Sequence, residues 1–117
     1  MNVIGFGGVF WRSSNISELK KWYKEVLGIP LDNEWNGTIF PSKEGNETIF
    51  SLFKEDSDYF PMEQQVMLNF QVEDMNECVK HLQKLGISLL KEPEKSEFGT
   101  FTWIADPEGR RIELWEK

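Results

Sequence analysis

The sequence of 117 residues predicts one α+β domain, built from two copies of a β-α-β-β-β unit with a largely antiparallel sheet. Three observations favour this fold. Two amphipathic helices have similar beginnings and ends, the offset between them is about half the chain, and short turns join consecutive strand-like segments. We therefore assign residues 1–60 to the first unit and residues 61–117 to the second.

The two predicted helices carry the same boundary signals. Asn15 is the N-cap of the first helix, whose apolar residues recur at spacings of three and four until Gly28 ends it. The second helix follows the N-cap Asp74, 59 residues later, and Gly86 ends it. The same Leu-Gly-Ile sequence closes both helices, which indicates a duplication.

Strand-like segments flank both helices. They are residues 3–12, 35–40 and 48–53 in the first unit, and residues 66–72, 87–90, 101–105 and 111–115 in the second. Asp106-Pro107-Glu108-Gly109 has the composition of a tight turn between the last two segments. Because short turns join consecutive strands, we expect most of the sheet to be antiparallel.

Composition excludes several classes of protein. A net charge of −7 is opposite in sign to that of most nucleic-acid-binding domains. One cysteine, Cys78, excludes an internal disulfide, and one histidine, His81, excludes a Ser-His-Asp site or a multi-histidine metal site. No apolar run approaches the roughly 18 residues of a membrane span. We expect a cytoplasmic protein without nucleic-acid or membrane partners.

Three short motifs occur in order along the chain. They are Trp22-Tyr23 ahead of Leu27-Gly28, Phe70-x-Val72-x-Asp74, and Asp106-Pro107-x-Gly109 followed by Ile112-Glu113-Leu114. With the duplicated unit, they make the whole chain resemble the glyoxalase/bleomycin resistance/dioxygenase family, the vicinal oxygen chelate superfamily. The resemblance implies that the sheet curls into an open cup with the helices outside and a pocket inside. It also implies a homodimer.

The resemblance further implies where a divalent metal ion would bind in the family's enzymes. The aligned ligand positions hold Gly8, Met67 and Glu113. Glycine has no ligand atom, and a thioether is a poor ligand for hard or borderline divalent ions. Since one carboxylate does not make a metal site, we expect no catalytic metal and no cofactor, with a divalent metal as the disfavoured alternative.

Strand alternation around these positions indicates which side chains line the cup. The predicted ligand-binding residues are Phe10, Arg12, Met67, Asn69, Gln71, Glu113 and Trp115. The alternate residues Leu68, Phe70, Val72, Ile112 and Leu114 are predicted to face the helices. Several alternatives stay open. Glu113 either pairs with Arg12 or contacts a ligand. The side-chain amides of Asn69 and Gln71 either contact a ligand or form hydrogen bonds with the backbone. Trp115 and Trp103 either line the cup or belong to the core or to a dimer interface.

An inward set of aromatic, amide and charged groups is typical of a site for an organic ligand. The sequence therefore predicts a glyoxalase-like protein that binds a small organic molecule in the cup without a catalytic metal. The acidic balance favours a cationic ligand, as for the drug-sequestering members of the family. The alternative is a glyoxalase-type lyase or isomerase that uses Glu113 as base or metal ligand. A third hypothesis is a protein-interaction role.

Overall fold

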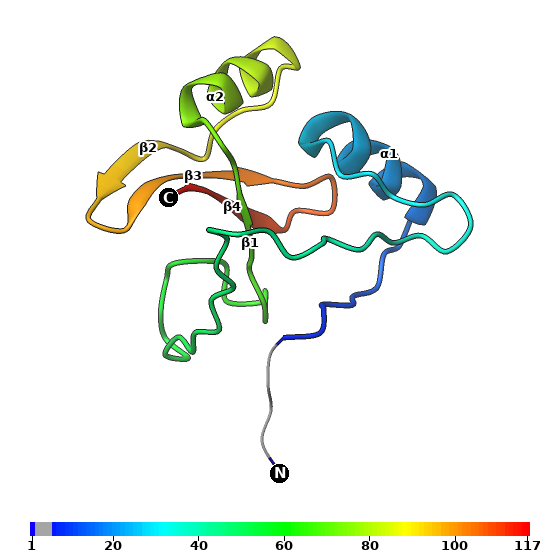
Figure 1. The fold of residues 1–117 in the computed structure, drawn as a ribbon, viewed down its shortest axis with the longest axis horizontal. Helices are drawn as coiled ribbons and strands as arrows, with labels where there is room; N and C mark the ends of the chain where they lie inside the picture. The colour runs from blue at the N-terminus through cyan, green and yellow to red at the C-terminus, as the bar shows by residue number, and fades with distance from the viewer. Residues whose placement is uncertain (2–5) are drawn as a thin grey trace.

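Two helices cover one face of a four-stranded sheet in the computed structural model, which describes residue 1 and residues 6–117 (Figure 1). In the order of the chain, the described elements are α1 (Ile16–Leu27), β1 (Leu68–Gln71), α2 (Met75–Lys84), β2 (Lys91–Ser96), β3 (Gly99–Ala105) and β4 (Arg111–Glu116). Neither of the described helices has the length and apolar character that crossing a membrane would require.

The sheet has the strand order β1-β4-β3-β2. Strands β2 and β3, and β3 and β4, pair antiparallel, whereas β1 pairs parallel to β4. Residues 68–116 thus form the β-α-β-β-β unit predicted for the second half of the chain. The strand predicted at residues 87–90 is wrong, because this segment packs Ile87 and Leu89 against the core and β2 begins only at Lys91. The α+β class and the largely antiparallel sheet are confirmed.

The core lies between the helices and one face of the sheet. Its strand residues Ile104, Ile112 and Leu114 are at most 1% exposed. The helices contribute Leu19, Tyr23, Val26, Met75 and Leu82. Ile112 and Leu114 therefore face the helices as predicted. The residues that alternate with them in β4 project from the opposite face, since side chains alternate along a strand.

Both helices begin as predicted. The side chain of Asn15 accepts a hydrogen bond from the backbone N–H of Glu18 at 3.1 Å, and the side chain of Asp74 accepts one from Glu77 at the same distance. At the other end, Gly28 caps α1 in the left-handed conformation, with φ of 67°. These local signals define the helix boundaries independently of the sheet.

A buried carboxylate connects α1 to the turn between β3 and β4. Asp106, 5% exposed, accepts a hydrogen bond from the Tyr23 hydroxyl at 2.9 Å. It also accepts from the backbone N–H groups of Glu108 and Arg110, and from the Arg110 guanidinium at 3.3 Å. Two of the motifs singled out in the sequence therefore meet in space.

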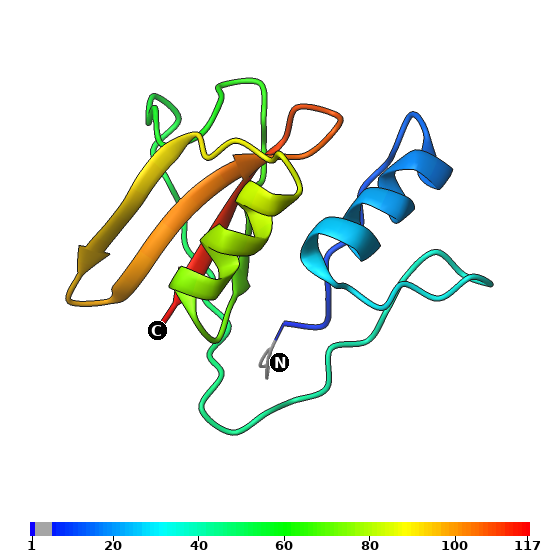
Figure 2. The same ribbon diagram turned by 90° about the horizontal axis from the view of Figure 1, so that it is seen from above.

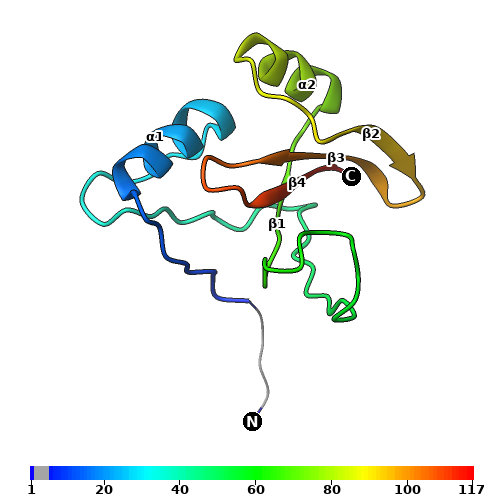
Figure 3. The same ribbon diagram turned by 180° about the vertical axis from the view of Figure 1, so that it is seen from behind.

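The first half of the chain differs from the prediction. Among residues 6–60, the regular element described is α1, and residues 35–40 and 48–53 are not strands. The predicted strand at residues 3–12 lies partly outside the described residues. The chain after α1 leaves the helix layer and passes around the sheet, and residues 45–66 lie on the face opposite the helices (Figures 2 and 3).

The physical reason is the absence of a covering surface in the described chain. The side chains of Ile39, Phe50 and Leu52 are 79%, 76% and 85% exposed. Ordering an extended backbone costs conformational entropy, which a strand recovers through ladder hydrogen bonds and a buried face. These segments have strand-forming residues but no buried face, so local preference alone does not make them strands.

Candidate functional site

A row of four side chains crosses the sheet on the face opposite the helices. The backbone register places Lys91 of β2 opposite Trp103 of β3, Trp103 opposite Glu113 of β4, and Glu113 beside Asn69 of β1. Paired residues of neighbouring strands point to the same side of a sheet. Each strand therefore contributes one residue to this row.

Glu113 is the centre of the row. It is 7% exposed, and its carboxylate accepts hydrogen bonds from Trp103 Nε1 at 2.9 Å, from Asn69 Nδ2 at 2.7 Å and from the Tyr59 hydroxyl. In the part of the chain that the structure describes, no cationic group lies within ion-pair distance of it. A buried carboxylate is costly unless hydrogen bonds satisfy its oxygens, and here three neutral donors do so.

Tyr59 reaches Glu113 from residues 54–65, the segment that connects the two halves. Burial raises the pKa of the Tyr59 phenol above its usual range, and the hydrogen bond and charge of Glu113 raise it further. The phenol therefore stays protonated and donates to the carboxylate. Its ring packs edge-on against Trp103, with 6.1 Å between ring centroids.

Gln64 anchors this segment to the start of β4. Its Oε1 accepts from the backbone N–H of Arg111 at 2.8 Å, and its Nε2 donates to the Arg111 carbonyl at 2.9 Å. The side chain thus takes the place of a neighbouring strand at that residue. This contact fixes the segment that carries Tyr59 against the sheet.

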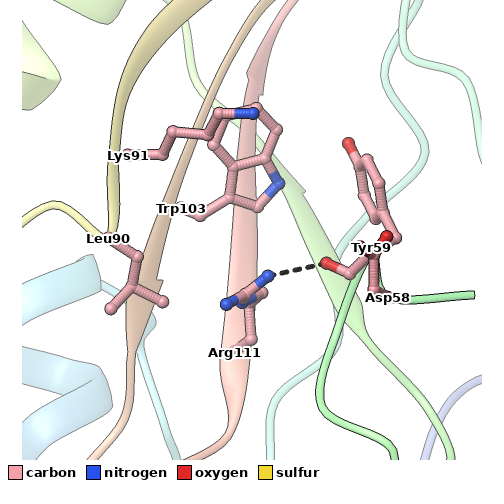
Figure 4. A pocket seen from close by; sticks show the side chains of 6 residues that line it. All are labelled: Asp58, Tyr59, Leu90, Lys91, Trp103 and Arg111. Carbon is pink, nitrogen blue, oxygen red and sulfur yellow. Dashed lines mark hydrogen bonds between the residues drawn. The ribbon is translucent and has the colours of Figure 1, made fainter.

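A hollow of about 240 Å³ opens beside the row (Figure 4). Its lining residues are Asp58, Tyr59, Leu90, Lys91, Trp103 and Arg111. The Arg111 guanidinium donates through Nη1 to the Tyr59 carbonyl at 2.8 Å, while its Nε is buried without a hydrogen-bond partner. Lys91 Nζ lies 2.7 Å from Glu94 and 5.4 Å from the centroid of the Trp103 ring. The hollow thus combines aromatic walls with charged groups.

Five of the predicted site residues lie on or next to the sheet. Asn69 and Glu113 meet in the row, and Met67 is half-buried directly before β1. Trp115 shares the face of Glu113, but its ring stacks on Phe101 and its Nε1 donates to the Phe98 carbonyl at 2.8 Å.

Gln71 lies outside the row, at a shallow second hollow of about 330 Å³ among exposed loop residues. Its amide oxygen accepts from the backbone N–H of Glu47 at 3.3 Å. Of the alternatives left open for the two amides, Asn69 contacts a site residue and Gln71 satisfies the backbone.

The structure does not bring Phe10 and Arg12 to the row. Phe10 is 89% exposed, and Arg12 is exposed with its carbonyl accepting from the Arg110 guanidinium at 2.7 Å. Although the structure describes both partners, Glu113 and Arg12 form no ion pair. The alternation that assigned them inward applies only to a strand within the sheet, and residues 6–12 are not in it.

Tyr59, Trp103, Lys91 and Arg111 are absent from the predicted ligand-binding residues, although a place for Trp103 in the cup was one of the open alternatives. Two signals could have found three of them. Arg111 lies two residues before Glu113 in the same strand, so both side chains point to the same face. The turn at residues 106–109 sets the register of the hairpin, which places Trp103 opposite Glu113 and Lys91 next to Trp103. Tyr59 follows no periodic pattern, so the sequence has no equivalent signal for it.

The described residues contain no group of three or more His, Cys, Asp or Glu side chains that could hold a metal ion. Apart from Glu113, the polar groups around the row are those of Tyr59, Asn69, Trp103 and Lys91. An indole N–H and an ammonium can only donate hydrogen bonds. The arrangement therefore has the chemistry of an anion-stabilising cradle around one carboxylate.

A family model described as a glyoxalase-like domain matches residues 8–115. A search of curated proteins finds no match to the chain. Among solved structures, the chain is similar to a glyoxylase/bleomycin resistance protein/dioxygenase domain from Frankia sp. EAN1pec, with a TM-score of 0.63 and 19% identity over 98% of this chain and 93% of that chain.

Two other solved structures of similar fold are proteins whose names state a function. TnmS3, an antibiotic binding protein from Streptomyces sp. CB03234, has a TM-score of 0.57 and 21% identity over 88% of this chain and 87% of that chain. Lactoylglutathione lyase from Agrobacterium tumefaciens has a TM-score of 0.57 and 12% identity over 89% of this chain and 87% of that chain. These similarities show a shared fold.

Proposed function

The chain belongs to the glyoxalase-like domain family, within the glyoxalase/bleomycin resistance/dioxygenase superfamily, and from this membership we propose that it binds a small organic molecule in the hollow beside Glu113. The observation that carries the proposal is the hollow itself. Aromatic rings of Tyr59 and Trp103 form part of its wall, and the buried Glu113 cluster fixes both rings in place. Apolar walls with a few well-placed polar groups are usual for such sites.

We propose that this binding needs no catalytic metal. The residues at the ligand positions of the family's enzymes do not fit a divalent ion, since Gly8 has no ligand atom and Met67 has only a thioether. The Trp103 N–H points at Glu113 and would face any cation bound there. Stoichiometric zinc, nickel, iron or manganese in the purified protein, lost in Glu113→Ala, would contradict this part of the proposal.

The binding function is favoured over a lyase or isomerase with Glu113 as base. A carboxylate has about four acceptor positions, and Tyr59, Asn69 and Trp103 occupy three of them. One acceptor position remains for a substrate, so the protein's own donors already use most of this carboxylate.

A library of small organic molecules tests the binding function by thermal shift. A molecule that binds only the folded protein raises its stability by about 2.7 kcal/mol at a hundredfold excess over its Kd. We expect such a molecule to quench tryptophan emission and to bind at least tenfold more weakly to Trp103→Leu.

The matched control is Trp35→Leu, since Trp35 is 53% exposed and does not line the hollow. We expect Trp35→Leu to bind like the wild type. The proposal would be contradicted if no molecule of the library stabilised the protein, or if Trp103→Leu and Trp35→Leu lowered the affinity for the ligand equally.

We also propose that a second copy of the chain covers the apolar residues exposed on the first half. They are Ile39, Phe40, Ile49, Phe50 and Leu52, each more than 60% exposed. Contiguous exposed apolar side chains are typical of protein interfaces. Light scattering is expected to give twice the chain mass of 13.7 kDa, and Leu52→Glu to lower it. A mass of one chain across micromolar to hundred-micromolar concentrations would contradict the dimer.

We place these partners, a small molecule and a second copy, in the cytoplasm. The chain has one cysteine, Cys78, which fits a reducing compartment. A charge of −7 opposes binding to nucleic acids, so we propose no such partner.

A further inference from the structure

We infer that the ligand of the hollow carries an anionic oxygen group, such as a carboxylate or a phosphate, which Arg111 binds while an apolar part of the ligand lies on Trp103 and Tyr59. This inference rests on the proposed function and names the chemical class of the ligand. It replaces the cationic ligand that the overall charge of the chain favours.

Arg111 has more hydrogen-bond donors than the protein uses. A guanidinium has five N–H groups, and the side chain of Arg111 makes one hydrogen bond, from Nη1 to the Tyr59 carbonyl. Its Nε is buried without a partner. The Arg111 side chain lines the hollow, so its other N–H groups, beyond the one that the Tyr59 carbonyl accepts, are donors for a ligand oxygen there.

The positive charge of Arg111 is also unpaired within the described chain. No Asp or Glu there lies within 4.0 Å of its guanidinium, although Asp58 lines the same hollow. Residues 2–5 contain no acidic side chain. A guanidinium presents a planar fork that matches a carboxylate or phosphate in two hydrogen bonds. The hollow therefore contains a recognition group for an anion.

Glu113 is not a comparable recognition group for a cation. Trp103 and Tyr59 both donate to its Oε2 and Asn69 donates to its Oε1, so a cationic ligand would find one acceptor position left, on a side chain that is 7% exposed. Lys91, on the rim of the hollow, is already paired with Glu94, so Arg111 is the cation there without an acidic partner among the described residues. The net charge of the whole chain affects the rate of encounter more than affinity at a particular site.

Three probes of similar shape and different charge test the inference. They are 2-naphthylacetate, 2-naphthylacetamide and 2-(2-naphthyl)ethylamine, titrated calorimetrically into the full chain. We expect the carboxylate to bind about tenfold or more tightly than the amide, and the amine to bind most weakly. Adding 2-naphthyl phosphate distinguishes phosphate from carboxylate recognition, and tighter Arg111-dependent binding of either anion supports the inference.

Arg111→Gln is expected to weaken carboxylate binding about tenfold or more and to abolish the preference over the amide. Arg111→Lys retains the charge without the fork, so we expect an intermediate affinity. The matched control is Arg12→Gln, because Arg12 is exposed and contributes only its carbonyl to the described contacts. It should bind the probes like the wild type.

Three outcomes would overturn the inference. They are tightest binding of the amine, equal binding of all probes, and anion binding that ignores Arg111→Gln. In each case the proposed function survives if a library ligand still depends on Trp103. Loss of Trp103-dependent binding for every library molecule and every probe would instead overturn both the inference and the proposed function.

Discussion

Asp106→Ala is expected to lower the free energy of unfolding by about 2–4 kcal/mol, because several buried donors lose their acceptor at once. The Tyr23 hydroxyl, the backbone N–H groups of Glu108 and Arg110, and the Arg110 guanidinium all donate to this carboxylate. Tyr23 is 4% exposed, so water does not replace the lost partner. Urea denaturation of wild type and variant measures the difference.

The matched control for this prediction is Asp56→Ala. Asp56 lies in the exposed connection between the halves, and its substitution is expected to change stability by less than about 0.5 kcal/mol. Tyr23→Phe removes one of the hydrogen bonds to Asp106 and is expected to cost about 1 kcal/mol. If the two variants had the same free energy of unfolding, the contact between the turn and α1 would not stabilise the protein.

The network around Asp106 also joins the two halves, although the described residues of the first half form no strand. The Ser13 hydroxyl donates to Glu108 at 2.5 Å, and Arg110 donates to the Arg12 carbonyl. Both contacts join the residues before α1 to the β3–β4 turn. In the described chain, side-chain contacts therefore attach the first half to the sheet: these at the turn, and the hydrogen bond of Tyr59 to Glu113.

The second half of the chain was predictable because its signals are local and agree with one another. The N-cap Asp74, the alternation in β1 and β4, and the turn at residues 106–109 each define one element, and together they place Asn69 beside Glu113. The inward-facing carboxylate and amide follow from parity alone. This part of the site needed no knowledge of distant contacts.

The rest of the site depends on contacts that alternation does not describe. Tyr59 comes from a segment without regular structure, and the Gln64 contact to the Arg111 backbone that holds it joins residues 47 apart. The prediction that Arg12 lines the cup was wrong because residues 6–12 lie outside the sheet, and a strand-like sequence outside the sheet has no inward face. Parity predicts the direction of a side chain only after the strand has a partner.

High pH is expected to destabilise the protein through Tyr23. Burial raises the pKa of the Tyr23 phenol above its usual value near 10, and the charge and hydrogen bond of Asp106 raise it further. The stabilising contribution is complete below about pH 10 and decreases above it, because the unfolded chain then releases a proton that the folded protein retains. The loss reaches at most about 1.4 kcal/mol per pH unit.

Urea denaturation between about pH 9 and about pH 11 is the direct measurement, with Tyr23→Phe as the comparison. Lysine deprotonation affects both proteins equally, so the difference between them isolates Tyr23. We expect the wild type to lose its advantage over Tyr23→Phe as the pH rises. A constant difference across this range would show that the Tyr23 phenol ionises as readily in the folded protein as in the unfolded chain.

The same variant makes Tyr59 a reporter of the site, because the chain has only two tyrosines. In Tyr23→Phe, all tyrosinate absorbance comes from Tyr59, whose pKa is raised by burial and then by the hydrogen bond and charge of Glu113. Adding Glu113→Gln deletes that charge and keeps the shape, so tyrosinate is expected to form at lower pH. An unchanged midpoint would place Tyr59 away from Glu113 in solution. It would then leave the hollow without the aromatic wall on which ligand binding depends.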